Sequence, residues 1–219
     1  MIWVRIVCLV IGYAFGLFQT GYIYSRAKGV DIRQHGSGNV GTTNLKRVLG
    51  VKAGVITYIG DALKLLIAVF LVMFVFRDSG IDVYMLAVYT ALGCVLGHNF
   101  PFYLKFKGGK GIAVTSALVI STLDWRYILI SFGIFFLVVG ITRMVSLGSL
   151  CLVSSFFVSV LITTQLGFSK YDTPYKYETY IILAIITALA YFQHRANIKR
   201  IANGTESKFT FKKKPDVEI

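Results

Sequence analysis

The sequence has few charged residues. Asp, Glu, Lys and Arg make up only 15% of its 219 residues, whereas 56% are hydrophobic, and the mean hydropathy is +0.69. A soluble domain of this size is rarely so apolar. Because the apolar residues form long runs rather than periodic stripes, we expect an all-α, polytopic integral membrane protein, a helical bundle.

Cysteine is also scarce, and no CxxC pair occurs. Cys8, Cys94 and Cys151 are far apart, each inside an apolar run, so no disulfide framework is indicated. Cys94 and His98 stand four residues apart, which would suit a metal site, but no further Cys or acidic residue clusters with them. We expect neither a metal nor a cysteine nucleophile. Asp61 and Lys64, three residues apart inside an apolar run, are better explained as an internal ion pair than as a proton relay.

The chain shows no internal repeat and no polar stretch long enough for a second core. We therefore expect one membrane-embedded domain, residues 1–203, and a loosely ordered basic cytoplasmic tail, residues 204–219. The N-terminal segment lacks a clear small-residue cleavage site, and we interpret it as a retained first span rather than a signal peptide. The apolar segments run over residues 2–24, 53–76, 83–98, 112–123, 127–142, 147–167 and 179–193.

Charge distribution predicts how these segments cross the membrane. The net charge of +13 would suggest nucleic acid in a soluble protein, but in a membrane protein Lys and Arg gather in cytoplasmic loops, so we expect no nucleic-acid partner. With seven crossings and the N-terminus outside, most basic residues and the tail fall on the cytoplasmic side. Segment 112–123 is too short to cross comfortably, and omitting it would move the later loops to the other face.

The first predicted cytoplasmic loop reads RQHGSGNVGTTNLKRVLG. Its glycines allow backbone N–H groups to turn toward an anion, its hydroxyls and amides add donors, and Arg47 can bind phosphate with two N–H groups. The alternative is a flexible polar loop that only caps helices.

The second loop contains FKGGKG, residues 106–111. It is not a Walker A motif, because Gly109-Lys110 is followed by Gly rather than by Ser or Thr. Nevertheless it combines a flexible backbone, two lysines and the start of a helix, which favours anion binding. RMVSLGS, starting at Arg143, and QHRANIKRIANGTESKF, containing His194, follow later. Taken alone, the first of these motifs is explained by an Arg that marks the cytoplasmic end of a span, and the second by a basic helix end.

Together, HGSGNVGTTN with Arg47, GHNFP with FKGGKG, RMVSLGS, and HRANIKRIANGTESKF resemble the acyl-phosphate:glycerol-3-phosphate acyltransferases, the PlsY family of bacterial membranes. The resemblance covers nearly the whole chain, with the motifs in the same order and spacing. The sequence departs from the family pattern at Thr42 or Thr43, where Ala is common, and at GIAVT and GLFQTGY. These departures affect packing around the rim of the site.

The resemblance implies seven helices and an active site at the cytoplasmic face of the bacterial inner membrane. It implies acyl transfer from acyl phosphate to the sn-1 hydroxyl of glycerol 3-phosphate, giving lysophosphatidic acid, with no metal or nucleotide cofactor. The partners would be these two substrates and membrane lipids. A monomer is compatible with the sequence, which leaves the oligomeric state open.

Under this reading, two phosphates must be held close together. We expect Lys107 or Lys110 with Gly108, Gly109 and Gly111 to hold one phosphate, that of the donor, and Ser37, Arg47 and a lysine to seat glycerol 3-phosphate, with Gly38 beside them. Which lysine holds which phosphate is left open. The remaining expected site residues orient hydroxyls or close the far side: Asn39, Asn44, Asn197, His98, Arg143, Ser146 and His194. The donor phosphate itself could accept the hydroxyl proton, with His98 or His194 as the alternative general base.

Two other functions compete. Acyltransferases that use acyl-CoA carry a His-x-x-x-x-Asp pair, but Val40, Tyr103 and Lys199 stand five residues after the three histidines. An organic-phosphate or anion transporter would place its site near mid-bilayer, between matching halves. Here the polar motifs gather at one predicted face, which favours the enzyme.

Overall fold

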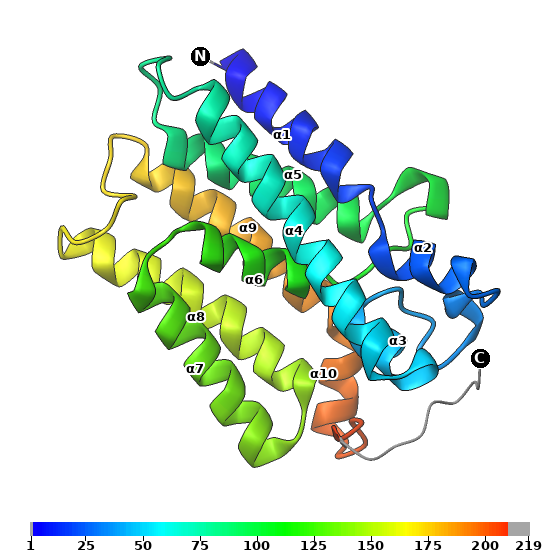
Figure 1. Ribbon diagram of the computed structural model, residues 1–219. Coiled ribbons are helices and arrows are strands. Elements are labelled where there is room, and N and C mark those ends of the chain that lie inside the picture. Colours follow the sequence, from blue (N-terminus) through cyan, green and yellow to red (C-terminus); the bar gives the residue numbers. More distant parts are fainter. Residues whose placement is uncertain (1, 210–219) are drawn as a thin grey trace.

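The computed structural model describes residues 2–209, and this part of the chain consists of helices and connecting loops (Figure 1). Two short 3₁₀ turns, η1 (Ile32–Gln34) and η2 (Phe102–Leu104), interrupt the loops. The all-helical prediction is confirmed. The helices, in chain order, are α1 (Ile2–Gly16), α2 (Thr20–Ala27), α3 (Thr42–Leu49), α4 (Val51–Val75), α5 (Val83–Asn99), α6 (Ile112–Ser121), α7 (Trp125–Thr142), α8 (Val145–Gln165), α9 (Lys176–Gln193) and α10 (Arg195–Ala202).

Five stretches among the described residues are long and apolar enough to cross a membrane, the first being α1 and α2 taken together. A sixth would be the pair α9 and α10, which bend by 60° at His194. Helix α6 has ten residues, about 15 Å at 1.5 Å per residue, roughly half of the hydrocarbon thickness. Most of α6 is buried inside the bundle, so protein rather than lipid surrounds it. The prediction of seven crossings remains a prediction.

Helix α1 packs closely along α5 because glycines meet on the facing surfaces. A Cβ atom at Gly12 or Gly16 of α1 would overlap the backbone of α5, and one at Gly93 or Gly97 of α5 would overlap the backbone of α1. Small residues let helix backbones approach in this way inside membranes, where van der Waals packing drives association. The contact fixes His98, at the end of α5, against the end of α1.

The connecting loops collect at two opposite ends of the bundle (Figure 1). The N-terminal end of α1 lies with the loops that follow α4, α6 and α8, where Arg5 pairs with Glu178 at 2.6 Å. Glu178 also accepts a hydrogen bond from Tyr89. The opposite end carries α2, α3, α10 and the loops around residues 28–41, 100–111 and 142–145. All four sequence motifs therefore lie at this second end.

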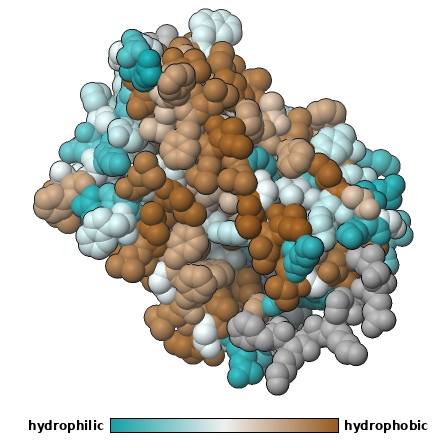
Figure 2. Space-filling view, in the orientation of Figure 1, coloured by the Kyte–Doolittle hydropathy of each residue, from teal (hydrophilic) through white to brown (hydrophobic). Residues whose placement is uncertain are grey.

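Between the two ends the surface is hydrophobic. Figure 2 shows a broad apolar band on one face, with more polar residues toward the upper left and the right. Helix α7 is the most exposed part, since only Tyr127 and Ser131 are buried, and Phe136 and Ile141 are exposed by 66% and 76%. Such a surface suits a hydrocarbon environment. Phe102 and Tyr103 are also exposed, and they do not line the cavity described below.

Two polar segments are more ordered than we expected. The first loop ends in helix α3, and the last motif forms helix α10. Both helices are amphipathic, but their many polar residues gave no sign of a helix in the sequence. The predicted tail does not leave the bundle at residue 204: the Phe209 backbone N–H donates to the Arg143 carbonyl at 2.6 Å. The remainder of the predicted tail, including Lys212–Lys214, lies outside the described residues.

Candidate active site

A cavity of about 450 Å³ opens at the end of the bundle that carries α3 and α10. Its wall combines polar residues of the four motifs with apolar side chains of α6 to α8, such as Ile112, Phe135 and Val145. Ten of the fifteen residues predicted for the site line this cavity, namely Ser37, Asn39, Asn44, Arg47, His98, Lys110, Gly111, Ser146, His194 and Asn197. Loops far apart in the sequence therefore converge on one polar space beside an apolar wall.

Asn44 shapes the first loop. Its side-chain amide donates to the His35 and Asn39 carbonyls at 3.0 and 2.9 Å, and its oxygen accepts from the Ser37 N–H at 2.8 Å. Gly36 and Gly38 have φ values of +60° and +71°, which let the chain turn around this amide. Both amide hydrogens of Asn44 are thus used by the loop. Asn44 therefore holds Ser37 at the cavity rim, and its predicted contact with a substrate hydroxyl stays a prediction.

Asn39 joins the first loop to the second. Its amide nitrogen donates to the Gly108 carbonyl at 3.3 Å, while its oxygen accepts from the Gly41 N–H at 2.9 Å. This link brings the glycine-rich segments together. Arg47 follows on α3, half-buried, and lines the cavity without an acidic partner among residues 2–209. A half-buried guanidinium with unused donors is suited to an anion.

Lys110 and Asn197 meet across the cavity. The Lys110 Nζ donates to Asn197 Oδ1 at 2.5 Å. Burial lowers the pKa of Lys110 to about 8, helped by the positive charges of Arg200 and Arg47 and opposed by the negative charge of Glu206. Because burial destabilises the charged form of Lys110 in the empty cavity, a bound anion stabilises this ammonium more than it would an exposed one.

Among residues 204–209, Glu206 is the acidic residue that lines the cavity, and three donors share its carboxylate. Ser146 Oγ and Asn197 Nδ2 donate to one carboxylate oxygen, both at 2.7 Å, and Arg200 Nε donates to the other at 2.8 Å. Burial acts to raise the pKa of Glu206, but these hydrogen bonds outweigh it and the pKa is lowered. The ionised carboxylate thus fastens α8, α10 and the following residues together.

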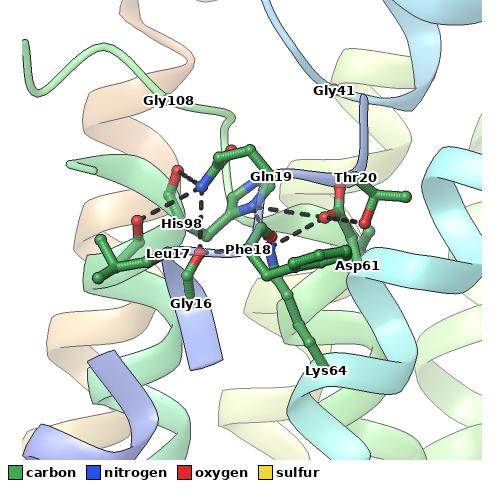
Figure 3. Close-up of polar contacts among 12 residues, drawn as sticks. Gly16, Leu17, Phe18, Gln19, Thr20, Gly41, Asp61, Lys64, His98 and Gly108 are labelled. Atoms are coloured by element: carbon green, nitrogen blue, oxygen red, sulfur yellow. Dashed lines mark hydrogen bonds and ion pairs between the residues drawn. The ribbon is translucent and has the colours of Figure 1, made fainter. Parts of the chain in front are cut away.

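His98 and Asp61 line the cavity near α1, and Lys64, which is not part of the lining, contacts both of them (Figure 3). Lys64 Nζ lies 2.9 Å from Asp61 Oδ1 and 2.9 Å from His98 Nδ1. The ion pair predicted between Asp61 and Lys64 is confirmed. The spacing of three residues predicted that pair. His98 lies 34 residues beyond Lys64, so nothing in the local sequence indicated that it would join the cluster.

His194 stands at the bend between α9 and α10. Its Nδ1 lies 2.8 Å from the Ala190 carbonyl, which can only accept, so Nδ1 carries the proton and Nε2 holds the lone pair. His194 is 2% exposed and lines the cavity. The third histidine, His35, is exposed and not part of the lining.

Five predicted site residues do not line the cavity: Gly38, Lys107, Gly108, Gly109 and Arg143. Lys107 is exposed, so of the two candidate lysines only Lys110 lies in the cavity. Gly108 and Gly109 instead wrap around His98, because a Cβ on either would overlap that residue. Arg143 ends α7 in a left-handed conformation, φ +60°, and its carbonyl holds the Phe209 backbone.

Several lining residues were not among the predicted site residues. Tyr58 of α4 contacts the Ser116 hydroxyl at 3.1 Å, and Phe135 of α7 faces the cavity from an otherwise lipid-exposed helix. Both stand inside apolar runs, where nothing in the sequence marks one aromatic residue over another. Arg200 and Glu206 belong to the fourth motif, and their opposite charges six residues apart were the available signal.

Among residues 2–209, no three His, Cys, Asp or Glu side chains gather closely enough to hold a metal ion. The fold and the cavity define an integral membrane protein with a polar, largely cationic site at one end of a helical bundle. A family model described as glycerol-3-phosphate acyltransferase matches residues 6–204. The chain belongs to this glycerol-3-phosphate acyltransferase family.

Individual relatives agree with that assignment. The chain is 41% identical to the glycerol-3-phosphate acyltransferase of Clostridioides difficile (strain 630), over 95% of this chain and 97% of that protein. It is 32% identical to PlsY (YgiH), an integral membrane glycerol 3-phosphate acyltransferase whose crystal structure is known in a glycerol 3-phosphate form. That comparison has a TM-score of 0.80 and covers 94% of this chain and 96% of the other. The lysophosphatidic acid form of PlsY gives a TM-score of 0.78 at the same identity, covering 94% of this chain and 95% of the other. The family named from the sequence motifs is thereby confirmed.

Proposed function

We propose that this protein transfers a fatty acyl group from acyl phosphate to the sn-1 hydroxyl of glycerol 3-phosphate. The products are lysophosphatidic acid and phosphate. The observation that carries the proposal is the convergence of Ser37, Arg47, Lys110 and Asn197 on one cavity with an apolar wall. Its relatives, one of them crystallised with glycerol 3-phosphate, support the acceptor.

Two anions meet in this cavity, and its cations divide between them. Lys110, with Gly111 at the start of α6, holds the phosphate of the acyl donor. Arg47 and Ser37 bind the phosphate of glycerol 3-phosphate on the opposite wall. Asn197 bridges Lys110 and Glu206, so it keeps the lysine pointed into the cavity. The acyl chain lies along the apolar side, near Phe135 and Ile112.

The reaction is a direct transfer. The sn-1 hydroxyl oxygen attacks the carbonyl carbon, the bond from that carbon to the phosphate oxygen breaks, and phosphate leaves with the hydroxyl proton. An acyl phosphate is a mixed anhydride with a good leaving group, so positioning and electrostatic stabilisation supply most of the rate. His194 Nε2, which carries a lone pair, is the alternative proton acceptor.

The cavity faces the cytoplasm of a bacterial inner membrane. Seven segments cross or enter the bilayer, with the N-terminus outside and the C-terminus inside. The end of the bundle that carries α3 and α10 holds the loops in which basic residues gather, which supports this orientation. Glycerol 3-phosphate then arrives from water and the acyl phosphate from the lipid. A single copy of the chain contains every group that this scheme uses.

Turnover of palmitoyl phosphate and glycerol 3-phosphate by the purified protein tests the proposal, with palmitoyl-CoA as the control donor. We expect lysophosphatidic acid from the phosphate donor only. Product from palmitoyl-CoA alone, or uptake of glycerol 3-phosphate into proteoliposomes without turnover, would contradict it. A radiolabelled acyl group that stays on the protein after the acceptor is removed would contradict direct transfer.

Two variants separate the phosphate sites. Arg47→Ala should raise the KM for glycerol 3-phosphate, by about 10- to 100-fold if a charge-assisted contact of 1.5–3 kcal/mol is lost. Lys110→Ala should instead impair use of the acyl donor. Lys107→Ala is the matched control, because its side chain is exposed and outside the cavity. Equal losses in the two lysine variants would contradict the assignment.

A further inference from the structure

We propose that Lys64 and Asp61 are positioning residues that fix His98 as a hydrogen-bond donor to the acyl carbonyl oxygen as that oxygen becomes negatively charged. The inference rests on the proposed acyl transfer for its acceptor. It excludes His98 as the general base. Its foundation is the hydrogen-bonding geometry of the buried cluster in Figure 3.

The lysine determines which histidine nitrogen carries the proton. Three acceptors surround Lys64 Nζ at short distance: the Phe18 carbonyl at 2.6 Å, Asp61 Oδ1 at 2.9 Å and His98 Nδ1 at 2.9 Å. The Gly16 carbonyl is a fourth, longer contact at 3.4 Å. An ammonium has no lone pair, so Lys64 cannot accept a hydrogen bond from Nδ1 and can only donate to it. His98 Nδ1 must therefore accept, and the ring proton sits on Nε2.

The charges of the cluster keep His98 neutral. Lys64 and Asp61 are exposed by 4% and 1%, and their opposite charges cancel. Protonating His98 would place an uncompensated positive charge next to the ammonium in a buried site, which is unfavourable. Thr20 Oγ1 also donates to Asp61 Oδ1 at 3.0 Å. The other charged residues that line the cavity are Arg47, Lys110, Arg200, Glu206 and Lys208.

The Nε2 edge of the ring is held in place and unused. His98 is 2% exposed, its backbone carbonyl accepts from Gln19 Nε2 and from the Gly109 N–H, both at 3.1 Å, and its ring lies against Gly109. A side chain at residue 109 would fill the space beside Nε2. Within residues 2–209 this nitrogen has no hydrogen-bonding partner, although His98 lines the cavity. The Nε2–H is thus held beside Gly109 in the ring of a cavity-lining residue, and a fixed, unpaired N–H at such a position is suited to a substrate oxygen.

The acyl carbonyl is the oxygen that fits this donor best. A phosphate is held by a full cation, and Arg47 and Lys110 already supply those charges. The His98 wall carries no net charge and includes the Asp61 carboxylate, which repels a phosphate dianion more than a neutral carbonyl. When the hydroxyl oxygen attacks, the carbonyl electron pair moves onto its oxygen. The Nε2–H then stabilises a charge that exists only in the transition state.

The two cavity histidines thus have opposite proton arrangements. Nε2 is a donor in His98 and an acceptor in His194, because Lys64 faces the Nδ1 of the first and a carbonyl faces the Nδ1 of the second. If a histidine takes the hydroxyl proton in this protein, it is His194.

Nitrogen NMR of protein labelled with ¹⁵N-histidine tests the assignment without any turnover. We expect His98, identified by its loss in His98→Gln, to show a protonated Nε2 and an unprotonated Nδ1 from about pH 6 to 9. In the double variant Asp61→Asn/Lys64→Met, which removes the ion pair as a unit, we expect both tautomers. A protonated Nδ1 or an imidazolium in the unmodified protein overturns the proposal, whatever the enzyme assay shows.

Kinetics supply the second arm. His98→Ala should lower kcat by about 10²–10³-fold, as for other removed oxyanion donors, with little change in the KM for glycerol 3-phosphate. His98→Gln, whose amide N–H replaces Nε2–H, should recover part of that loss. Cys94→Ala, one turn earlier and equally buried, is the packing control. A loss of rate at acid pH that disappears in His98→Gln would make His98 a base and overturn the inference. Absence of turnover in the unmodified protein would instead refute the proposed function and leave the NMR result standing.

Discussion

At the scale of single residues, the site depends on charges kept partly out of water. Lys110 donates to the oxygen of the Asn197 amide, and Glu206 accepts from its nitrogen. The pKa of Lys110 is lowered, which favours the neutral amine, and the pKa of Glu206 is lowered, which favours the carboxylate. The cavity therefore contains a cation that is easily lost at alkaline pH and an anion that persists to acid pH.

Lys110 should give the enzyme an alkaline limit. Its pKa of about 8 lies below the usual value near 10.4, so the ammonium is present below pH 8 and is lost as the pH rises through that value. The kcat/KM for acyl phosphate, which reports ionisations of the free enzyme, should fall above about pH 8. Lys110→Arg keeps its charge, and its profile should stay level to higher pH. The same fall in the arginine variant would assign it to another group.

Glu206 should contribute to stability through its three donors. Glu206→Ala leaves the buried donors of Ser146 and Asn197 unpaired, and each such donor costs about 1–3 kcal/mol. Arg200, whose side chain is 43% exposed, can turn to water. We expect a lower Tm in detergent, with Glu206→Gln intermediate because it retains an acceptor oxygen. Unchanged thermal unfolding of Glu206→Ala would show that these contacts are replaced by water at no cost.

At the scale of secondary-structure elements, the position of most helices could be predicted, but their interruptions could not. Apolar runs located α4, α5, α7, α8 and α9 to within a few residues, because hydrocarbon selects long hydrophobic stretches directly. The first run was predicted as one continuous segment, yet it breaks between Gly16 and Thr20. There the free carbonyls of Gly16 and Phe18 accept from Lys64, a partner 46 residues or more away.

The glycine contact between α1 and α5 should be the most sensitive helix interface. Gly93→Ala places a methyl group against the Leu9 backbone and should cost about 1–3 kcal/mol through overpacking. Gly140→Ala in α7 is the matched control, since no atom lies within 4 Å of its added Cβ. That substitution should leave the stability of the protein unchanged or raise it by up to about 1 kcal/mol, because alanine has a higher helix propensity than glycine. Thermal unfolding of both variants in one detergent compares them. Equal Tm values would show that α1 moves away at little cost.

At the scale of the whole molecule, the motifs predicted which segments meet at the cavity, but not which contacts each residue makes there. Arg47, Lys110 and His194 were expected together and do line one cavity. The first two stand in polar stretches whose chemistry can be read locally. Gly108 and Gly109 were expected beside the donor phosphate but lie outside the cavity lining, and they pack against His98, a contact that no local pattern records. Asn44 lines the cavity as expected and also holds the first loop.

The orientation of the bundle can be tested on a cysteine-free background. Ser79→Cys, in the exposed loop after α4, should react with a membrane-impermeant maleimide added to intact cells. Lys199→Cys, exposed on α10, should react only after the cells are opened. Labelling of both positions in intact cells would contradict the predicted orientation.

The contact of Glu206 with Ser146, Asn197 and Arg200 has a consequence for biosynthesis. The cavity wall runs from Gly36 to Phe209, so nearly the whole chain must leave the ribosome before the wall is complete. A nascent polypeptide halted after α9 but before Glu206 has its membrane helices but an incomplete cavity wall. During translation the membrane helices are therefore synthesised before the residues that complete the cavity wall, so insertion can precede activity.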